Sequence, residues 1–275
     1  MALEFRPLSP TVGAQVIGFD PARPYDDTTV RELRAAFLKY HLLLVRGGEI
    51  AEQDEIRFSE LFGPVSRKGD NMKHGRKVMR ISNVHADGAF PTGELLFHSD
   101  HVFFQWPLKA IALYGEQVPG AGGDTVFSNA AAAWDLLPAA LKERVRHLQA
   151  VNVYDYKVNA GNQRFDPASV SPDAPRHVHP IAWTHPDTGR TVLFVNPLMT
   201  ATVVGMDPQE SDALLQQLFS YILAPAVHYQ HKWQLHDLVF WDNRILQHAR
   251  TNFDPAEKRV LRRVPIAENE LAAAA

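Results

Sequence analysis

Apolar residues along this chain follow two spacings, which predict two kinds of secondary structure. Between residues 27 and 40, Val30, Leu33 and Phe37 recur at helical spacing, so an amphipathic helix is expected there. Elsewhere the apolar residues form short runs bounded by glycine, proline or polar residues, a pattern typical of buried strands. The predicted strands are 41–45, 78–84, 108–114, 192–195, 227–231, 238–241 and 260–266.

Further helices are predicted where a capping residue precedes an apolar pattern or a Gly-Pro pair follows one. Asn129 can cap one helix, and Asp207, followed by Pro208, can cap another. Many strands, few helices and no regular strand–helix alternation favour a β-sandwich or barrel with helices packed outside it. Besides 27–40, the expected helices are 50–62, 129–137, 138–147 and 207–223.

Composition and charge exclude several classes of protein. Charged residues make up 21% of the chain and the net charge is −3, so no nucleic-acid-binding surface is expected. No apolar stretch approaches the length of about 18 residues that a membrane-spanning helix needs. Residues 1–6 lack the basic and apolar regions of a signal peptide. With no cysteine there are no disulfides or thiolate metal sites, and we expect one cytoplasmic domain spanning residues 1–275.

Three residues combine into a candidate metal site. His98-Ser99-Asp100 lies between two apolar runs, and His248 follows the apolar run 238–241. Two imidazoles and one carboxylate match the facial triad of non-haem Fe(II) oxygenases, which leaves open coordination positions. On a strand, the side chains of His98 and Asp100 would share one face, and His248 would come from a neighbouring strand.

Other histidines compete for this role. His85 and Asp87 form a second His-x-Asp pair, but it runs into glycine and proline residues and is expected to be a loop. His177 and His179 are also two residues apart but lack a carboxylate at the matching offset. The earlier set is therefore the favoured metal site.

Arginines alternate along the last predicted strand. Strand spacing places Arg259 and Arg263 on one face, about 13 Å apart at roughly 3.3 Å per residue, so each could hold a different anion. A guanidinium suits a carboxylate because its fork donates two parallel hydrogen bonds. Arg262 falls on the opposite face and is expected to contact solvent.

The order and spacing of four motifs resemble the taurine dioxygenase family. Members of that family use Fe(II) and 2-oxoglutarate, and they include alkylsulfatase and chlorophenoxyacetate dioxygenases. The resemblance covers most of the chain, as far as Ile266. The motifs are Phe97-His98-Ser99-Asp100, Gly122-Gly123-Asp124-Thr125, Trp241-Asp242-Asn243-Arg244 with Gln247-His248, and Arg259 with Arg263.

The resemblance assigns a role to each motif. It implies that His98, Asp100 and His248 bind iron. It implies further that Thr125 and Arg259 hold the distal carboxylate of 2-oxoglutarate. The second assignment agrees with the chemistry of the side chain, because an arginine fork is suited to a carboxylate.

The substrate set is less specific. Arg263 maps to an arginine near the substrate in sulfonate-binding members, and Arg67 and Asn83 complete our predicted substrate-binding set. Glu94 stands where the taurine enzyme has an asparagine, which argues against taurine itself. The long irregular stretches 66–75 and 154–176 are candidate loops over the site. A small organic anion, such as a sulfonate, sulfate ester or carboxylate, is our hypothesis for the substrate.

The resemblance also implies a fold and a reaction. The implied core of the single catalytic domain is a double-stranded β-helix, or jelly roll. Fe(II) is the implied cofactor, and the substrate is hydroxylated while 2-oxoglutarate and O₂ are converted to succinate and CO₂. Asp100 argues against the halogenating relatives, which lack this carboxylate, whereas desaturation remains an alternative outcome. Family members are often dimers or tetramers, so a homo-oligomer is expected.

Two other interpretations of the metal site remain open. A set of two histidines and a carboxylate can hold Zn²⁺ and activate water for hydrolysis, although an Arg259–Thr125 anion site has no role there. The other is a non-catalytic metal-binding sensor of a small ligand. A visible charge-transfer band with Fe(II) and 2-oxoglutarate under anaerobic conditions would identify the oxygenase, because zinc cannot produce one.

Overall fold

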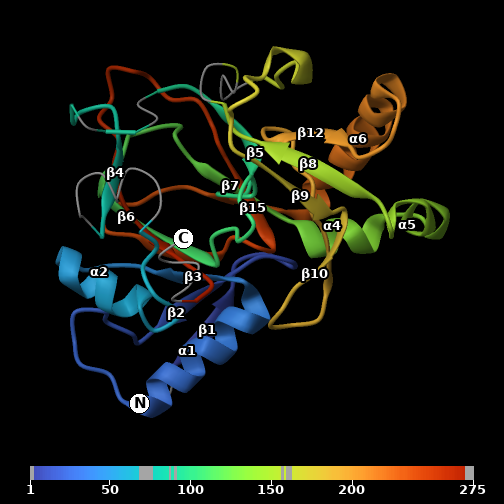
Figure 1. Cartoon of the computed structure of the whole chain (residues 1–275). Helices are drawn as coiled ribbons and strands as arrows, with labels where there is room; N and C mark the ends of the chain where they lie inside the picture. Colours follow the sequence, from blue (N-terminus) through green and yellow to red (C-terminus); the bar gives the residue numbers. More distant parts are fainter. Residues whose placement is uncertain are drawn as a thin grey trace.

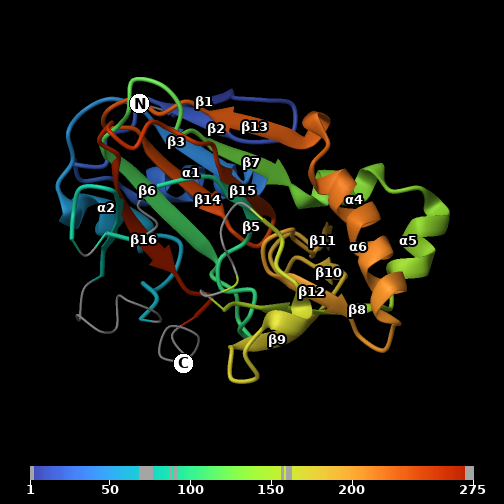
Figure 2. The same cartoon turned by 90° about the horizontal axis from the view of Figure 1, so that it is seen from above.

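Two β-sheets enclose the main hydrophobic core, and two helices cover the outer face of the larger sheet (Figure 1 and Figure 2). The structure is a computed structural model. It describes residues 3–67, 77–86, 88–89, 92–155, 158 and 163–269. The predicted class, mainly β with flanking helices, is confirmed. None of the described helices is long and apolar enough to cross a membrane.

The larger sheet has seven strands within the described residues. In order across the sheet they are β1 (Glu4–Pro7), β2 (Ala14–Ile17), β3 (Leu42–Val45), β14 (Leu238–Asp242), β6 (Ala110–Gln117), β16 (Val260–Ile266) and β4 (Met79–Ser82). Leu42 and Leu44 of β3 join the core between the sheets, whereas Leu43 and Val45 pack with the helices. Because both faces are buried, β3 is an unbroken apolar run rather than an alternating one.

The smaller sheet supplies much of the candidate site. Its strands, in order, are β13 (His228–His231), β7 (Thr125–Asn129), β15 (Leu246–Arg250) and β5 (Leu95–His98). The antiparallel register sets Thr125 opposite Arg250 and His248 opposite His98. The remaining strands are β12 (Thr200–Val203), β8 (Gln149–Val153) and β9 (Arg176–Pro180) in one sheet, and β10 (Ala182–Thr184) with β11 (Thr191–Leu193) in another.

The helices begin where side chains can cap them. Asp26 accepts a hydrogen bond from the Thr29 amide, and the predicted caps Asn129 and Asp207 accept from the first-turn amides of their helices. Figure 1 and Figure 2 both show α4, α5 and α6 grouped at the end of the molecule away from α2. The α-helices are α1 (Asp27–Tyr40), α2 (Glu52–Ser59), α4 (Ala130–Leu136), α5 (Ala139–Val145) and α6 (Pro208–Ile222), and the short 3₁₀ helices are η1 (Pro167–Ser169) and η2 (Pro225–Val227).

Apolar runs alone do not reveal every strand. Strand β15 is an example, because three of its five residues are polar, yet all but His248 are fully buried. Its Gln247 is accommodated by donating to the Val195 carbonyl at 2.6 Å, a contact that only the folded chain creates. Strand β5 was considered only through the His98–Asp100 spacing, and the other strands outside the predicted set are β1, β2, β7, β8, β9, β10, β12 and β15.

Candidate active site

The candidate metal ligands converge where β5 and β15 run antiparallel. His98 is the last residue of β5 and lies opposite His248 of β15. Asp100 lies in a turn, two residues beyond the end of β5. The structure brings the three residues together, but the expected strand geometry at Asp100 is wrong, because β5 ends before it.

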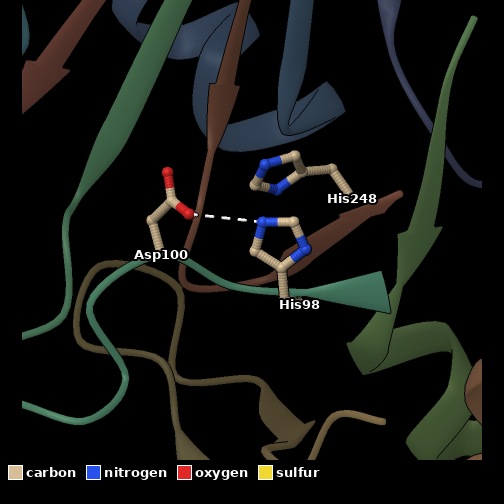
Figure 3. Close-up of side chains that lie close together, drawn as sticks. All are labelled: His98, Asp100 and His248. Atoms are coloured by element: carbon tan, nitrogen blue, oxygen red, sulfur yellow. Dashed lines mark ion pairs between the residues drawn. The ribbon is translucent and has the colours of Figure 1, made fainter. Parts of the chain in front are cut away.

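The ring of His98 presents one nitrogen to the carboxylate of Asp100 (Figure 3). Its Nδ1–H donates to the Leu96 carbonyl at 2.8 Å, so the free lone pair is on Nε2. That Nε2 lies 3.4 Å from Asp100 Oδ1. Two acceptors facing each other at this distance repel, whereas a bound cation would attract both. The pair therefore fits a metal ion.

The third candidate ligand, His248, is a neutral imidazole. Burial, with His98 nearby, lowers the pKa of His248 to about 3, so the ring keeps a lone pair at neutral pH. Its Nδ1 is buried and has no hydrogen-bond partner among the residues that the structure describes. A buried polar atom without a partner costs free energy. One ligand atom from each of the three residues lies within 4.8 Å of the others.

The carboxylate of Asp100 is shared between the histidines and an arginine. Its Oδ1 faces His98, and its Oδ2 accepts a hydrogen bond from Arg263 Nη2 at 2.5 Å. Burial alone would raise the pKa of Asp100, but the Arg263 guanidinium holds it well below its usual range. Asp100 is therefore ionised, as a metal ligand must be. Arg263, which we expected near the substrate, is thus already paired with Asp100 of the same chain.

Arg259 places a buried positive charge in the cavity that also contains the three candidate metal ligands. Its side chain is buried, and Nε donates to the Gly123 carbonyl at 3.0 Å. The terminal nitrogens have no acceptor among the described residues, and burial together with Arg250 lowers the pKa of Arg259 to about 9. A guanidinium still stays charged at neutral pH. A buried cation without a carboxylate partner favours an anionic ligand.

Thr125 lines the cavity with its hydroxyl oriented by an indole. Trp233 Nε1–H donates to Thr125 Oγ1 at 3.0 Å, which leaves the hydroxyl proton available for a ligand. Arg250 of β15 lies opposite Thr125 of β7, and its Nε donates to the Gly93 carbonyl at 2.8 Å. Burial lowers the pKa of Arg250 to about 10. The Thr125 hydroxyl and the guanidinium groups of Arg250 and Arg259 thus line one recess.

The triad and this recess belong to one cavity of about 230 Å³. On one side Phe103 and Tyr154 stack, with ring centroids 5.1 Å apart and an interplanar angle of 19°. Such a wall favours an apolar, ring-bearing ligand. The other apolar lining residues are Met79, Ile81, Leu95, Leu113, Leu198, Met199, Trp241, Ala249 and Leu261.

Two residues predicted to bind substrate lie outside this cavity lining. Asn83 Nδ2 donates to the Glu257 carbonyl at 2.7 Å, and its Oδ1 accepts from the Arg259 amide at 2.9 Å. Its side chain therefore positions the backbone of Arg259, in place of the expected contact with substrate. Arg67 is exposed and also lies outside the lining. Much of the 66–75 stretch and part of 154–176 lie outside the described residues.

Two further expectations can be compared with the structure. Arg262 was expected to contact solvent, but it is buried and its Nε donates to Glu55 at 2.8 Å. The reason is that α2, which carries Glu55, packs against that face of β16. His85 is exposed, and its partner in the second His-x-Asp pair, Asp87, lies outside the described residues.

Three residues of the site carried no predicted role. Arg250 could have been found, because it stands two residues after His248 and strand alternation puts both on one face. Trp233 has no local signal, and Asn243 stands in the Trp241–Arg244 motif without an assigned role. Their partners, Thr125 and Asp100, are 108 and 143 residues away in the sequence.

Comparison with known proteins agrees with this geometry. Residues 4–264 match the family described as "Taurine catabolism dioxygenase TauD, TfdA family". The chain is 32% identical to the (S)-phenoxypropionate/alpha-ketoglutarate-dioxygenase of Sphingobium herbicidovorans, over 94% of this chain and 93% of that protein. It is 29% identical to the alpha-ketoglutarate-dependent 2,4-dichlorophenoxyacetate dioxygenase of Cupriavidus pinatubonensis, over 96% and 97% of the two chains. The crystal structure of AAD-2 in complex with Mn(II) and N-oxalylglycine matches with a TM-score of 0.83 at 27% identity, covering 98% of this chain and 99% of that one.

Fold and site together define a non-haem iron dioxygenase that uses 2-oxoglutarate, built on a jelly-roll core. The chain belongs to the TauD/TfdA family. The family resemblance, the enzyme class and the expected Fe(II) and 2-oxoglutarate dependence are therefore confirmed. Nothing in these relatives supports a zinc hydrolase or a non-catalytic sensor.

Proposed function

We propose that this enzyme hydroxylates a small organic acid with an apolar body, using a metal held by His98, Asp100 and His248. The observation that carries the proposal is the composition of the cavity. It combines a cluster of metal-ligating side chains, a buried arginine that forms no ion pair with the described residues, and an aromatic wall.

In this proposal each part of the chain has a separate task. The two histidines and the carboxylate hold the metal and leave coordination positions open. Arg259 and Thr125 bind the distal carboxylate of 2-oxoglutarate through a charge-assisted fork and a hydroxyl. When bound, Fe(II) and 2-oxoglutarate supply the oxidising chemistry, which consumes O₂ and releases succinate and CO₂. The apolar wall orients the substrate and excludes water from the cavity.

Two features support an anionic substrate. Arg263 lines the cavity, and a guanidinium has five N–H donors, so its pair with Asp100 leaves donors for a second anion. The two relatives named above are a phenoxypropionate and a 2,4-dichlorophenoxyacetate dioxygenase, and both of these substrates are carboxylates with an aryloxy body. The stacked pair of Phe103 and Tyr154 would pack against such a ring.

A screen with matched compounds tests the proposal. Aryloxyalkanoates, alkyl sulfates and sulfonates are each compared with a neutral analogue, such as the primary amide of the same acid, for substrate-dependent succinate formation. We expect an acid to be turned over faster than its neutral analogue, and the product mass to distinguish hydroxylation from desaturation. Turnover of neutral or cationic compounds alone would reject the anionic substrate. Absence of the Fe(II)–2-oxoglutarate charge-transfer band would reject the metal and cosubstrate assignment.

A further inference from the structure

The buried side chain of Asn243 forms two hydrogen bonds with the main chain of Asp100. Asn243 Oδ1 accepts a hydrogen bond from the Asp100 amide at 2.8 Å, and its Nδ2 donates to the Asp100 carbonyl at 3.0 Å. The same Nδ2 donates to the Leu108 carbonyl at 3.0 Å. Asn243 is completely buried. Its acceptor and both of its donor hydrogens are therefore committed to backbone groups.

These hydrogen bonds are important because Asp100 lies outside any strand, so no strand pairing fixes its backbone. Strand β5 ends at His98, and the residue after Asp100, His101, has left-handed backbone geometry with φ of 62°. Apart from Asn243, the described backbone contact to Asp100 is a long hydrogen bond of 3.4 Å from the Leu108 amide to its carbonyl. Asn243 therefore holds the backbone from which the Asp100 side chain projects, while Arg263 bonds to the carboxylate itself.

The same residue connects Asp100 to the strand that carries His248. Asn243 lies in the turn between β14 and β15, and its own amide donates to the Lys109 carbonyl at 3.0 Å. His248 follows five residues later on β15. We propose that Asn243 is a positioning residue, which holds Asp100 in register with His248 so that the two can bind one metal ion. The inference rests on the proposed function, in which Asp100 is a metal ligand.

Metal affinity tests this inference without catalysis. Mn(II) binding to the purified full-length protein is measured by electron paramagnetic resonance of the free ion, for wild type, Asn243→Ala and Asn243→Asp. Loss of an outer-shell partner typically weakens metal binding by 10- to 100-fold, and we expect a rise of that order in the Mn(II) dissociation constant. Asn243→Asp keeps the acceptor for the Asp100 amide but turns both donors into acceptors, so it should lose at least as much.

A second buried asparagine provides a matched control. Asn129 also makes three hydrogen bonds to the backbone, from the amides of Ala131 and Ala132 and to the Thr11 carbonyl, and it does not line the cavity. Asn129→Ala should lower the unfolding temperature yet bind Mn(II) like wild type. Where Asn243→Ala does not fold, Asn243→Gln, which keeps the amide but displaces it by one methylene, gives the same readout.

The outcomes separate this inference from the assignment on which it rests. If folded Asn243 variants bind Mn(II) like wild type while Asp100→Ala does not, the positioning role is wrong and the metal site stands. The role is equally wrong if Asn129→Ala loses as much affinity as Asn243→Ala, because the loss would then reflect general destabilisation. If Asp100→Ala itself binds Mn(II) like wild type, the proposed metal site fails.

Discussion

Removing the guanidinium of Arg259, the residue just before β16, should weaken 2-oxoglutarate binding far more than any single change on that strand. The side chain is buried, and its terminal nitrogens have no acceptor among the described residues. Arg259→Ala would leave a buried carboxylate of the cosubstrate without its charge partner, a loss that costs about 2–5 kcal/mol. At about 1.4 kcal/mol per factor of ten, the dissociation constant should rise roughly 30- to 4,000-fold.

Anaerobic titration of the Fe(II)-loaded enzyme with 2-oxoglutarate measures this directly through the visible charge-transfer band. Arg259→Lys keeps the charge but loses the fork, so its affinity should fall between wild type and Arg259→Ala. Arg262→Lys is the matched control, because Arg262 is equally a buried arginine of this segment but pairs with Glu55 on the opposite face. The reasoning is refuted if Arg259→Ala binds 2-oxoglutarate within about threefold of wild type, since less than about 0.7 kcal/mol would then be lost. It is also refuted if the two lysine variants lose affinity equally.

Four further predictions concern the metal, the substrate, the cosubstrate and pH. Alanine at any of the three candidate metal ligands should abolish Fe(II) binding and 2-oxoglutarate decarboxylation, whereas His85→Ala should bind iron normally; the reverse pattern would mean that the other His-x-Asp pair is the site. Arg263→Ala should raise KM for the primary substrate with little change in 2-oxoglutarate affinity; equal loss of both would show that the arginines act as one cluster. Trp233→Phe removes one neutral hydrogen bond worth about 1 kcal/mol; because that bond is made within the protein, the 2-oxoglutarate dissociation constant should rise by at most about fivefold, and an unchanged value would exclude a role in orienting the threonine. Burial lowers the pKa of His41 to about 4; below pH 6.5 the unfolded chain binds a proton that the folded chain does not, so stability falls by about 1.4 kcal/mol per pH unit down to pH 4. Asparagine is tolerated at the φ of 62° found at this position. In His41→Asn, the free energy of unfolding measured with urea should therefore fall less steeply between pH 6.5 and pH 4, by about 1.4 kcal/mol per pH unit. The same steepness in variant and wild type would contradict this prediction.

Local sequence was sufficient wherever the cause of a structure is local. Helix α1 begins and ends where its apolar spacing predicts, because Asp26 caps its start and His41 ends it in left-handed geometry. The apolar runs of β3 and β14 predicted strands because both faces of that sheet are buried. Motif order was sufficient for the enzyme class, because the residues that bind metal and cosubstrate need specific chemistry at specific places along the chain.

Only the tertiary structure decided how these residues are held and which partners they have. Asp100 was expected on a strand, but it lies on a turn held by Asn243, 143 residues away. Arg262 is buried rather than exposed because α2 brings Glu55 to it, and Asn83 supports Arg259 rather than the cavity. Sequence spacing specifies which face of an element a residue occupies, whereas burial and partner depend on what packs against that face. Such contacts join distant segments, so no local pattern encodes them.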